Sequence, residues 1–239
     1  MGFFAFLRPT LGLLNQRIFA ALRLSVLPVL CGLGIWMLGR LYAGGEPSTG
    51  LSYLCFVLLE LLALCFCHAW FAIRWMRLVL LGEPQTAIGG LFPPRAWRRY
   101  GLRLFGLACG FWVVAEGVIA TTDHFWTLRP TGEWVRYITL YLGLAFVFHR
   151  ISPVLAGVPV GAPLTRGEAW RATRGANRAC LGLAAGTLLL SSILKFPLAP
   201  EGAEISAYEP LFIVAAFWIQ VLAFTSAVTV VYRRTVMGE

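Results

Sequence analysis

Two carboxylates in this chain stand inside strongly apolar segments, where an ionised group is expensive. Glu60 and Glu116 each lie within a run of about twenty apolar residues. A carboxylate at the centre of a membrane helix costs about 2.5–3.5 kcal/mol on insertion scales, so it normally faces protein or water and has a partner. On consecutive antiparallel helices the two would reach a similar depth and could share a proton. With Lys195 and Arg136 as candidate counter-charges, the pattern predicts either a proton or cation site or a structural clamp between helices.

Other chemically active residue types form no recognisable catalytic or metal site. The run Cys65-Phe66-Cys67-His68 has the composition of a metal motif. On a helix, however, residues two apart point to nearly opposite sides, so the two cysteines cannot share an ion. Nucleophile-elbow, P-loop, HExxH and dinucleotide-binding motifs are absent from the sequence. The sequence therefore indicates no catalytic residue, no metal and no cofactor, and it favours a non-enzymatic protein.

The composition is that of a protein whose solvent is a lipid bilayer. Of the 239 residues, 59% are hydrophobic and only 13% are charged, whereas soluble domains carry about 25% charged residues. The net charge of +9 would suggest nucleic acid as a partner of a soluble protein. Here the bases lie in short segments beside apolar runs, so membrane topology explains them and no nucleic-acid partner is expected.

Six apolar runs are long enough to cross a bilayer as helices. They comprise residues 24–41, 53–73, 102–121, 135–155, 179–197 and 211–232. Sixteen of the twenty Lys and Arg residues lie in the termini and in alternate connecting segments, so the positive-inside rule places both termini in the cytoplasm. The sequence predicts an all-α membrane protein, a single domain over residues 1–239 built as a bundle of six transmembrane helices.

Two basic, tryptophan-containing segments predict amphipathic helices lying on the cytoplasmic face of the membrane. One begins near Pro94, and the other follows Thr165, which with Glu168 has the spacing of a capping box. The N-terminal arm around Phe6 is expected to rest in the same interface. These faces either anchor the protein or bind anionic lipid headgroups, at about 1 kcal/mol per basic residue. The candidate lipid or partner surface comprises Arg74, Arg77, Arg95, Arg98, Arg99, Arg150, Arg171, Arg174, Arg178, Trp97 and Trp170.

The stretches 74–110 and 149–186 resemble each other. Each passes from the inner end of a span through Gly-x-Pro and Ala-Trp-Arg into an outgoing helix that opens with GxxxG. Both run in the same direction, which predicts a parallel repeat about an axis along the membrane normal. The GxxxG pairs, Gly106/Gly110 and Gly182/Gly186, permit close backbone approach, either inside this bundle or in a homo-oligomer.

The segment Arg74-Trp75-Met76-Arg77, followed by Leu80-Leu81-Gly82-Glu83, resembles a family of bacterial multi-pass inner-membrane proteins. That family often reads Arg-Trp-His-Arg before Leu-Leu-Gly-Glu. The stretch 150–175 is similar to the same family and, more distantly, to the YciC-like proteins and the membrane domain found with glycerophosphodiester phosphodiesterases. The resemblance implies a bacterial inner membrane and carries over no activity. Met76, where the family often has His, argues against a metal or proton role there.

Two functional hypotheses follow from these features. In the first, the chain is a non-enzymatic scaffold or accessory protein that contacts anionic lipids or a membrane partner through its Arg/Trp surface. In the alternative, it is a small transporter or lipid-handling protein that uses an outward-facing Glu60/Glu116 site. A water-filled cavity reaching both carboxylates would favour transport, whereas carboxylates bonded to Lys195 or Arg136 in a dry bundle would exclude it.

Overall fold

A computed structural model describes residues 4–43, 51–82, 94–126, 130–195 and 209–238, and all regular structure in these residues is helical. The elements are α1 (Phe4–Gln16), α2 (Ile18–Ala43), α3 (Leu51–Leu80), α4 (Pro94–Trp126), α5 (Pro130–Ile151), α6 (Pro153–Ala156), α7 (Arg166–Ala172), a 3₁₀ turn (Arg174–Ala176), α8 (Asn177–Lys195) and α9 (Glu209–Thr235). The prediction of an all-α protein is confirmed for the described residues.

Three segments within the described residues are long and apolar enough to cross a membrane. They are Leu54–Leu80, Arg95–Thr121 and Val135–Ala156, and α2 adds a fourth if Ile18–Val26 and Pro28–Ile35 count as one span bent by 46°. Pro28 sits at that bend, where its missing N–H and its ring disrupt the helical hydrogen bonds. The helices α8 and α9 cover most of the predicted runs 179–197 and 211–232.

The outer surface of the bundle is apolar, as expected for helices surrounded by lipid. Leu59 on α3, Val113 on α4 and Leu189 on α8 expose 65%, 64% and 63% of their side chains. Large contiguous apolar surfaces of this kind are not stable in water. The exposed side chains therefore support the same membrane assignment as the helix lengths.

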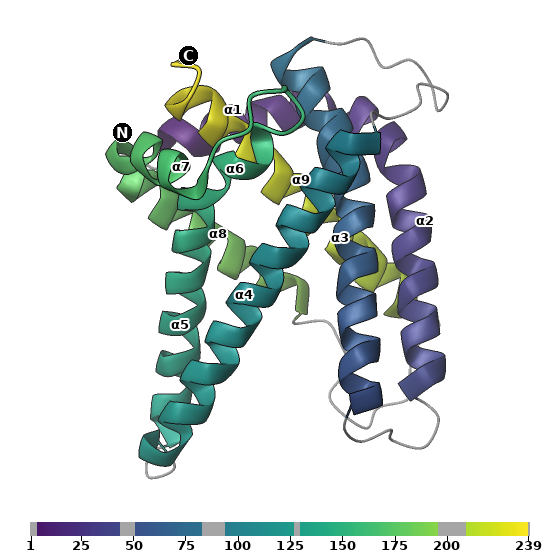
Figure 1. The fold of residues 1–239 in the computed structure, drawn as a ribbon, viewed down its shortest axis with the longest axis vertical. Coiled ribbons are helices and arrows are strands. Elements are labelled where there is room, and N and C mark those ends of the chain that lie inside the picture. Colours follow the sequence, from purple (N-terminus) through teal and green to yellow (C-terminus); the bar gives the residue numbers. More distant parts are fainter. Residues whose placement is uncertain (1–3, 44–50, 83–93, 127–129, 196–208, 239) are drawn as a thin grey trace.

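The chain termini lie at the same end of the bundle (Figure 1). The helices α1, α6 and α7 gather at this end, which we call the basic end for the arginines described below. There α3 packs against α4, and both contact the C-terminal half of the fold through α9 and α6. Towards the opposite end α3 and α4 diverge, so the α2/α3 pair and the α4/α5 pair form separate legs (Figure 1).

A buried segment made of a short helix and turns closes the basic end. Residues 152–159, which include α6 and the turns after it, are all buried. Leu155, Ala156 and Val158 pack with Met76 and Tyr100 in the largest core cluster. The backbone turns sharply at Gly157, where a Cβ would collide with the carbonyl oxygen of Ala162. We refer to residues 152–160 as the plug.

Two of the predicted interfacial elements differ from the structure. The segment that begins at Pro94 is not a separate helix, because it continues without a break to Trp126 as α4. The N-terminal arm does not rest only in the interface, since Phe6 of α1 is 0% exposed among Ala179, Cys180 and Val231. Burial of this ring between α8 and α9 ties α1 to the bundle.

The helix predicted to follow Thr165 forms as α7, with the predicted capping box. The Glu168 amide donates to Thr165 Oγ1 at 3.3 Å, and the Thr165 amide donates to Glu168 Oε2 at 2.7 Å. These reciprocal bonds satisfy two of the N–H groups that a helix N-terminus leaves without partners. They also hold the pKa of Glu168 below its usual value, through the backbone bond first and the bond from the Thr165 hydroxyl second.

Candidate functional site

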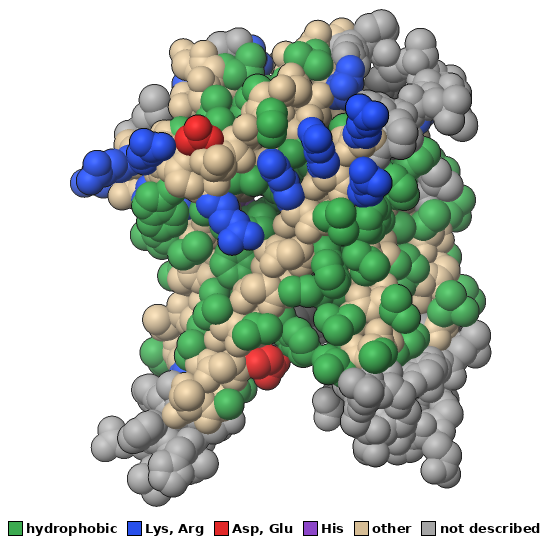
Figure 2. Space-filling model, in the orientation of Figure 1, with side chains coloured by type: hydrophobic (Ala, Val, Ile, Leu, Met, Phe, Trp, Pro, Cys, Tyr) green, Lys and Arg blue, Asp and Glu red, His purple; other side chains and the backbone are tan. Residues whose placement is uncertain are grey.

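Exposed arginines are concentrated at the basic end in two groups (Figure 2). One group lies on the first turns of α4 and the other on α7 and the start of α8. The exposed members are Arg95, Arg98, Arg99, Arg166, Arg171, Arg174 and Arg178. In the first group, spacings of three and four residues bring the side chains to one side of the helix.

Two further arginines bind the backbone of the plug. Arg77 of α3 donates from Nη1 to the Pro159 carbonyl at 3.2 Å, and Arg103 of α4 donates from Nη1 to the Val154 carbonyl at 3.0 Å. Carbonyls in a segment of mixed backbone structure lack some of the partners that a helix would supply, and burial makes an unpaired group costly. Arg77 and Arg103 therefore fasten the plug between α3 and α4.

Arg150 is a buried clamp at the end of α5, only 4% exposed. Its Nε donates to Thr173 Oγ1 at 2.9 Å, its Nη1 to Asn177 Oδ1 at 2.5 Å and its Nη2 to the Trp170 carbonyl at 2.6 Å. The guanidinium also lies 3.9 Å from the centroid of the Trp170 ring. Arg150 thus joins α5 to α7 and to the corner that leads into α8, and it is not part of the exposed surface.

The two tryptophans of the predicted surface also contact their own hairpins. Trp97 donates from Nε1 to the Phe66 carbonyl of α3 at 3.0 Å, and its ring meets the Phe66 ring edge-on at 4.8 Å. Trp170 stacks on Arg150 of α5. Each tryptophan therefore packs on the helix that precedes it in its own proposed repeat. Arg74 lies over the Trp70 ring at 4.8 Å, along α3.

Two basic cavities lie on either side of the loop that follows the plug. The first, about 410 Å³, is lined by Arg77, Arg95 and Arg99 together with apolar side chains that include Leu81 and Val158. The second, about 360 Å³, has Arg103 and Arg166 beside apolar residues of α4 and the loop. We call these the α3/α4 basic cavity and the α4/α7 basic cavity. Each joins guanidinium groups to an apolar wall at the same end of the bundle.

The two membrane carboxylates are not brought to a common site. Glu116 on α4 is exposed, Glu60 on α3 is half-buried, and the helices diverge in this half of the bundle (Figure 1). Neither carboxylate lines the α3/α4 basic cavity or the α4/α7 basic cavity. Arg136 is buried at the start of α5, with its guanidinium 4.9 Å from the Tyr137 ring centroid. The side chain of Lys195 lies outside the described residues.

Both membrane histidines pair with threonines in the bundle core. His68 Nε2 lies 3.3 Å from Thr225 Oγ1, and His149 Nε2 lies 3.2 Å from Thr187 Oγ1. Each threonine hydroxyl already donates to the carbonyl four residues before it. A hydroxyl has one proton to give, so each histidine is the donor through Nε2. These pairs are structural, and no group of three His, Cys, Asp or Glu residues in the described parts of the chain could hold a metal.

The GxxxG glycines occupy two different environments. A Cβ at Gly106 or Gly110 of α4 would meet nothing within 4 Å, so this face does not pack closely inside the described bundle. Gly186 on α8 is also exposed but lines a partly open apolar cavity between helices, where a Cβ would find open space.

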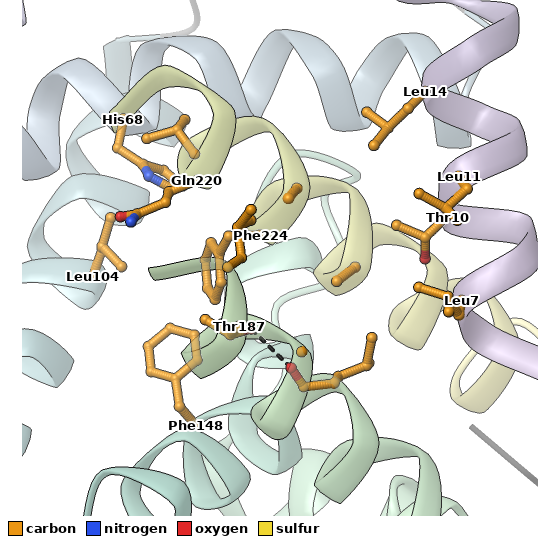
Figure 3. A pocket seen from close by; sticks show the side chains of 16 residues that line it. Leu7, Thr10, Leu11, Leu14, His68, Leu104, Phe148, Thr187, Gln220 and Phe224 are labelled. Carbon is orange, nitrogen blue, oxygen red and sulfur yellow. Dashed lines mark hydrogen bonds between the residues drawn. The ribbon is translucent and has the colours of Figure 1, made fainter. Parts of the chain in front are cut away.

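Sequence reasoning did not single out two residues that the structure places at important positions. Arg103 was counted only as a topological charge, and nothing local separates it from its exposed neighbours. Gln220 of α9 lines the apolar cavity, with its side chain directed towards His68 and Leu104 (Figure 3). The sequence could have indicated Gln220, because a single amide side chain inside a strongly apolar span often marks a functional position.

No family model, curated protein or solved structure matches this chain.

Proposed function

We propose that this protein binds anionic phospholipid headgroups at its basic end, as a non-enzymatic scaffold or accessory protein of a bacterial inner membrane. The α3/α4 basic cavity carries the proposal. It places Arg77, Arg95 and Arg99 beside Leu81 and Val158, so that a phosphate and the adjoining glycerol and acyl carbons can be bound together. Guanidinium groups suit phosphate because their planar donors can engage two oxygens at once.

The apolar wall favours a lipid over free phosphate or a nucleotide as the ligand. A soluble anion would gain nothing from Leu81 and Val158, whereas a lipid held at the membrane surface would keep its chain beside them. Juxtamembrane arginines also attract anionic lipids generally, at about 1 kcal/mol per residue. The α4/α7 basic cavity, with Arg103 and Arg166, offers the same combination on the other side of the loop.

The proposal includes a topology of six spans with both termini in the cytoplasm. The shared position of the termini at one end of the bundle supports an even number of crossings (Figure 1). The concentration of arginines at that end supports a cytoplasmic location for it. A duplication of the α3/α4 and α5/α8 hairpins is supported by the extensive packing within each pair and by the matching tryptophan contacts. The open Gly106/Gly110 face is a proposed contact for a second copy or another membrane protein.

The test is a titration of delipidated protein in neutral detergent with dioctanoyl phosphatidylglycerol, followed by intrinsic tryptophan fluorescence. The double variant Arg95→Gln/Arg99→Gln removes two guanidinium groups that are exposed and make no hydrogen bond to the described residues. At about 1 kcal/mol each, its affinity should fall about 30-fold. The matched control is Arg8→Gln/Arg23→Gln, which removes the same charge from exposed positions that do not line the cavity.

Three comparisons separate the possible explanations. Dioctanoyl phosphatidylcholine should bind at least tenfold more weakly to the native protein, because its headgroup has no net charge. Inorganic phosphate should compete only at much higher concentration, since it lacks the acyl carbons. Equal losses in the Arg95/Arg99 variant and in the Arg8/Arg23 control would show a diffuse charge effect, and an unchanged affinity in both would refute headgroup binding.

A further inference from the structure

A third cavity, distinct from the two basic ones, lies between helices of the bundle (Figure 3). It measures about 430 Å³, is partly open to the surface, and is lined by side chains of α1, α3, α4, α5, α8 and α9. Leu7 and Leu11 of α1 form one wall, while Phe148 and Phe224 form another. None of its sixteen lining residues is Asp, Glu, Lys or Arg. We call this space the apolar cavity.

The polar groups that line the apolar cavity are engaged within the protein, with one exception. Thr10 and Thr187 donate to carbonyls of their own helices, and His68 donates to Thr225. Gln220 has no hydrogen-bond partner among the described residues. Its amide carries two donor protons and an acceptor oxygen, and leaving such a group unpaired in an apolar region costs free energy. The cavity therefore presents one free hydrogen-bonding group in a hydrocarbon lining.

Several occupants can be compared by size and chemistry. A water molecule held in a cavity needs two to four polar partners, and Gln220 alone does not supply that many. A partner helix, about 10–12 Å across, needs a larger space than this. Small-molecule sites of about 300–1,000 Å³ with mainly apolar walls and few polar groups are typical of ligand pockets. In a bilayer the abundant ligand with this character is a lipid chain.

We propose that the apolar cavity binds a neutral lipid. Its hydrocarbon chain lies along the leucines of α1 and the phenylalanines of α5 and α9, and an uncharged oxygen, such as an ester carbonyl or hydroxyl, bonds to the Gln220 amide. The absence of charged lining residues selects against an anionic head. The site is independent of headgroup binding at the basic end, because no arginine lines it.

The experiment uses the full chain reconstituted in phosphatidylcholine vesicles with two photoactivatable probes. One is a monoacylglycerol with a diazirine in its chain, and the other is an alkane of matched length with the same diazirine. After illumination, labelled peptides are mapped by mass spectrometry. We expect labelling by the monoacylglycerol in α1 around residues 7–14 and in α9 around residues 220–227, and weaker labelling there by the alkane.

Two variants and one control test the assignment. Gly186→Leu fills the cavity without a backbone clash, because a Cβ at this position meets nothing within 4 Å. It should reduce labelling of α1 and α9 at least fivefold. Gly143→Leu makes the same change at an exposed glycine of α5 that does not line the cavity, and it should leave labelling unchanged.

The Gln220→Leu variant tests the polar contact separately. It should keep labelling by the alkane and lose the preference for the monoacylglycerol, because only the amide has been removed. Labelling of α1 and α9 that is insensitive to both Gly186→Leu and Gln220→Leu overturns the proposal, as does labelling confined to outward-facing residues. If Gly186→Leu does not fold, the probe preference in Gln220→Leu decides alone. Loss of phosphatidylglycerol binding at the basic end would not affect either result.

Discussion

Arg150 should control whether α7 stays docked on the end of α5. The substitution Arg150→Met keeps an unbranched apolar stem and removes the guanidinium. It thereby deletes three hydrogen bonds, to Thr173 Oγ1, Asn177 Oδ1 and the Trp170 carbonyl, and a cation–π contact at 3.9 Å. No other described residue of α5 makes as many hydrogen bonds to α7 and the turn that follows it.

The expected size of the effect follows from these contacts. Hydrogen bonds from a charged group contribute about 1.5–3 kcal/mol each, and the ring contact about 1 kcal/mol. Burial of the guanidinium offsets several kcal/mol of this sum. A net loss of about 3 kcal/mol is therefore expected, which corresponds to an increase of about 150-fold in the population with α7 undocked.

Limited trypsin digestion in detergent measures this opening. The sites after Arg166, Arg171 and Arg174 lie on or beside α7, and cleavage through a local opening follows the open population when reclosing is fast. Cleavage there should accelerate about a hundredfold in Arg150→Met. Arg150→Lys should be intermediate, because a single ammonium cannot engage three separated acceptors. Arg178→Met, at an exposed position of α8, should digest at the native rate.

Native digestion rates in Arg150→Met would refute the clamp. An equal acceleration in Arg178→Met would also contradict it, since that change removes charge without removing the contacts that hold α7. Both comparisons require that the variant keeps the native helix content. We expect its circular dichroism spectrum to be unchanged, because the clamp holds only α7.

Three further predictions test other parts of the fold. Gly157→Ala should destabilise the bundle by several kcal/mol in a denaturation series, because its Cβ meets a backbone carbonyl that cannot move away, whereas the same change at an exposed glycine of α5 should be nearly neutral. The bonds from Thr165 lower the pKa of Glu168 in the folded state. The capping box should therefore stabilise α7 fully above about pH 4.5, the ordinary pKa of a glutamate, and this stabilisation should be lost as the pH falls through the lower pKa of the folded state. Amide hydrogen exchange in α7 should become faster over that pH range in the native protein, and not in Glu168→Gln. Copper-phenanthroline oxidation should cross-link Cys31 to Cys67, which lie close together on α2 and α3, and Cys31→Ser should abolish the product seen by peptide mapping.

Local patterns predicted the parts of the structure that depend on neighbouring residues. The capping box of Thr165 and Glu168 requires only a hydroxyl and a carboxylate three positions apart, and it forms as expected. The apolar run 135–155 lies within the long apolar segment Val135–Ala156. The helix that begins at Pro94 and the span 102–121 were predicted as separate elements because hydropathy marks where lipid begins, whereas the structure continues one helix through both.

Contacts between distant segments were not readable from the sequence. Phe6 looks like an interfacial aromatic residue, and only the packing of α1 against α8 and α9 makes it part of the core. Glu60 and Glu116 were placed at comparable depths on neighbouring helices, but depth does not report the angle between helices, and α3 and α4 diverge where the carboxylates lie (Figure 1). The hypothesis that the two carboxylates share a proton depends on that angle and stays a prediction.

The arginines illustrate why one charge pattern can carry two functions. The positive-inside rule needs only a base near the end of a span and is indifferent to what the side chain binds. In the structure, Arg77, Arg103 and Arg150 are used to hold the plug and α7 against α3, α4 and α5. These bonds hold the plug and the loop after it in place. Arg95 and Arg99 lie beside that loop and remain exposed. Replacing Arg103, which does not line the α3/α4 basic cavity, should therefore weaken lipid binding in that cavity only by displacing the plug. Replacing the exposed Arg99 should weaken binding there and leave the plug in place. Arg103→Gln and Arg99→Gln can be compared by the protection of residues 152–166 from trypsin and by the affinity for phosphatidylglycerol. Loss of affinity with full protection in both variants would show that Arg103 binds lipid rather than the plug.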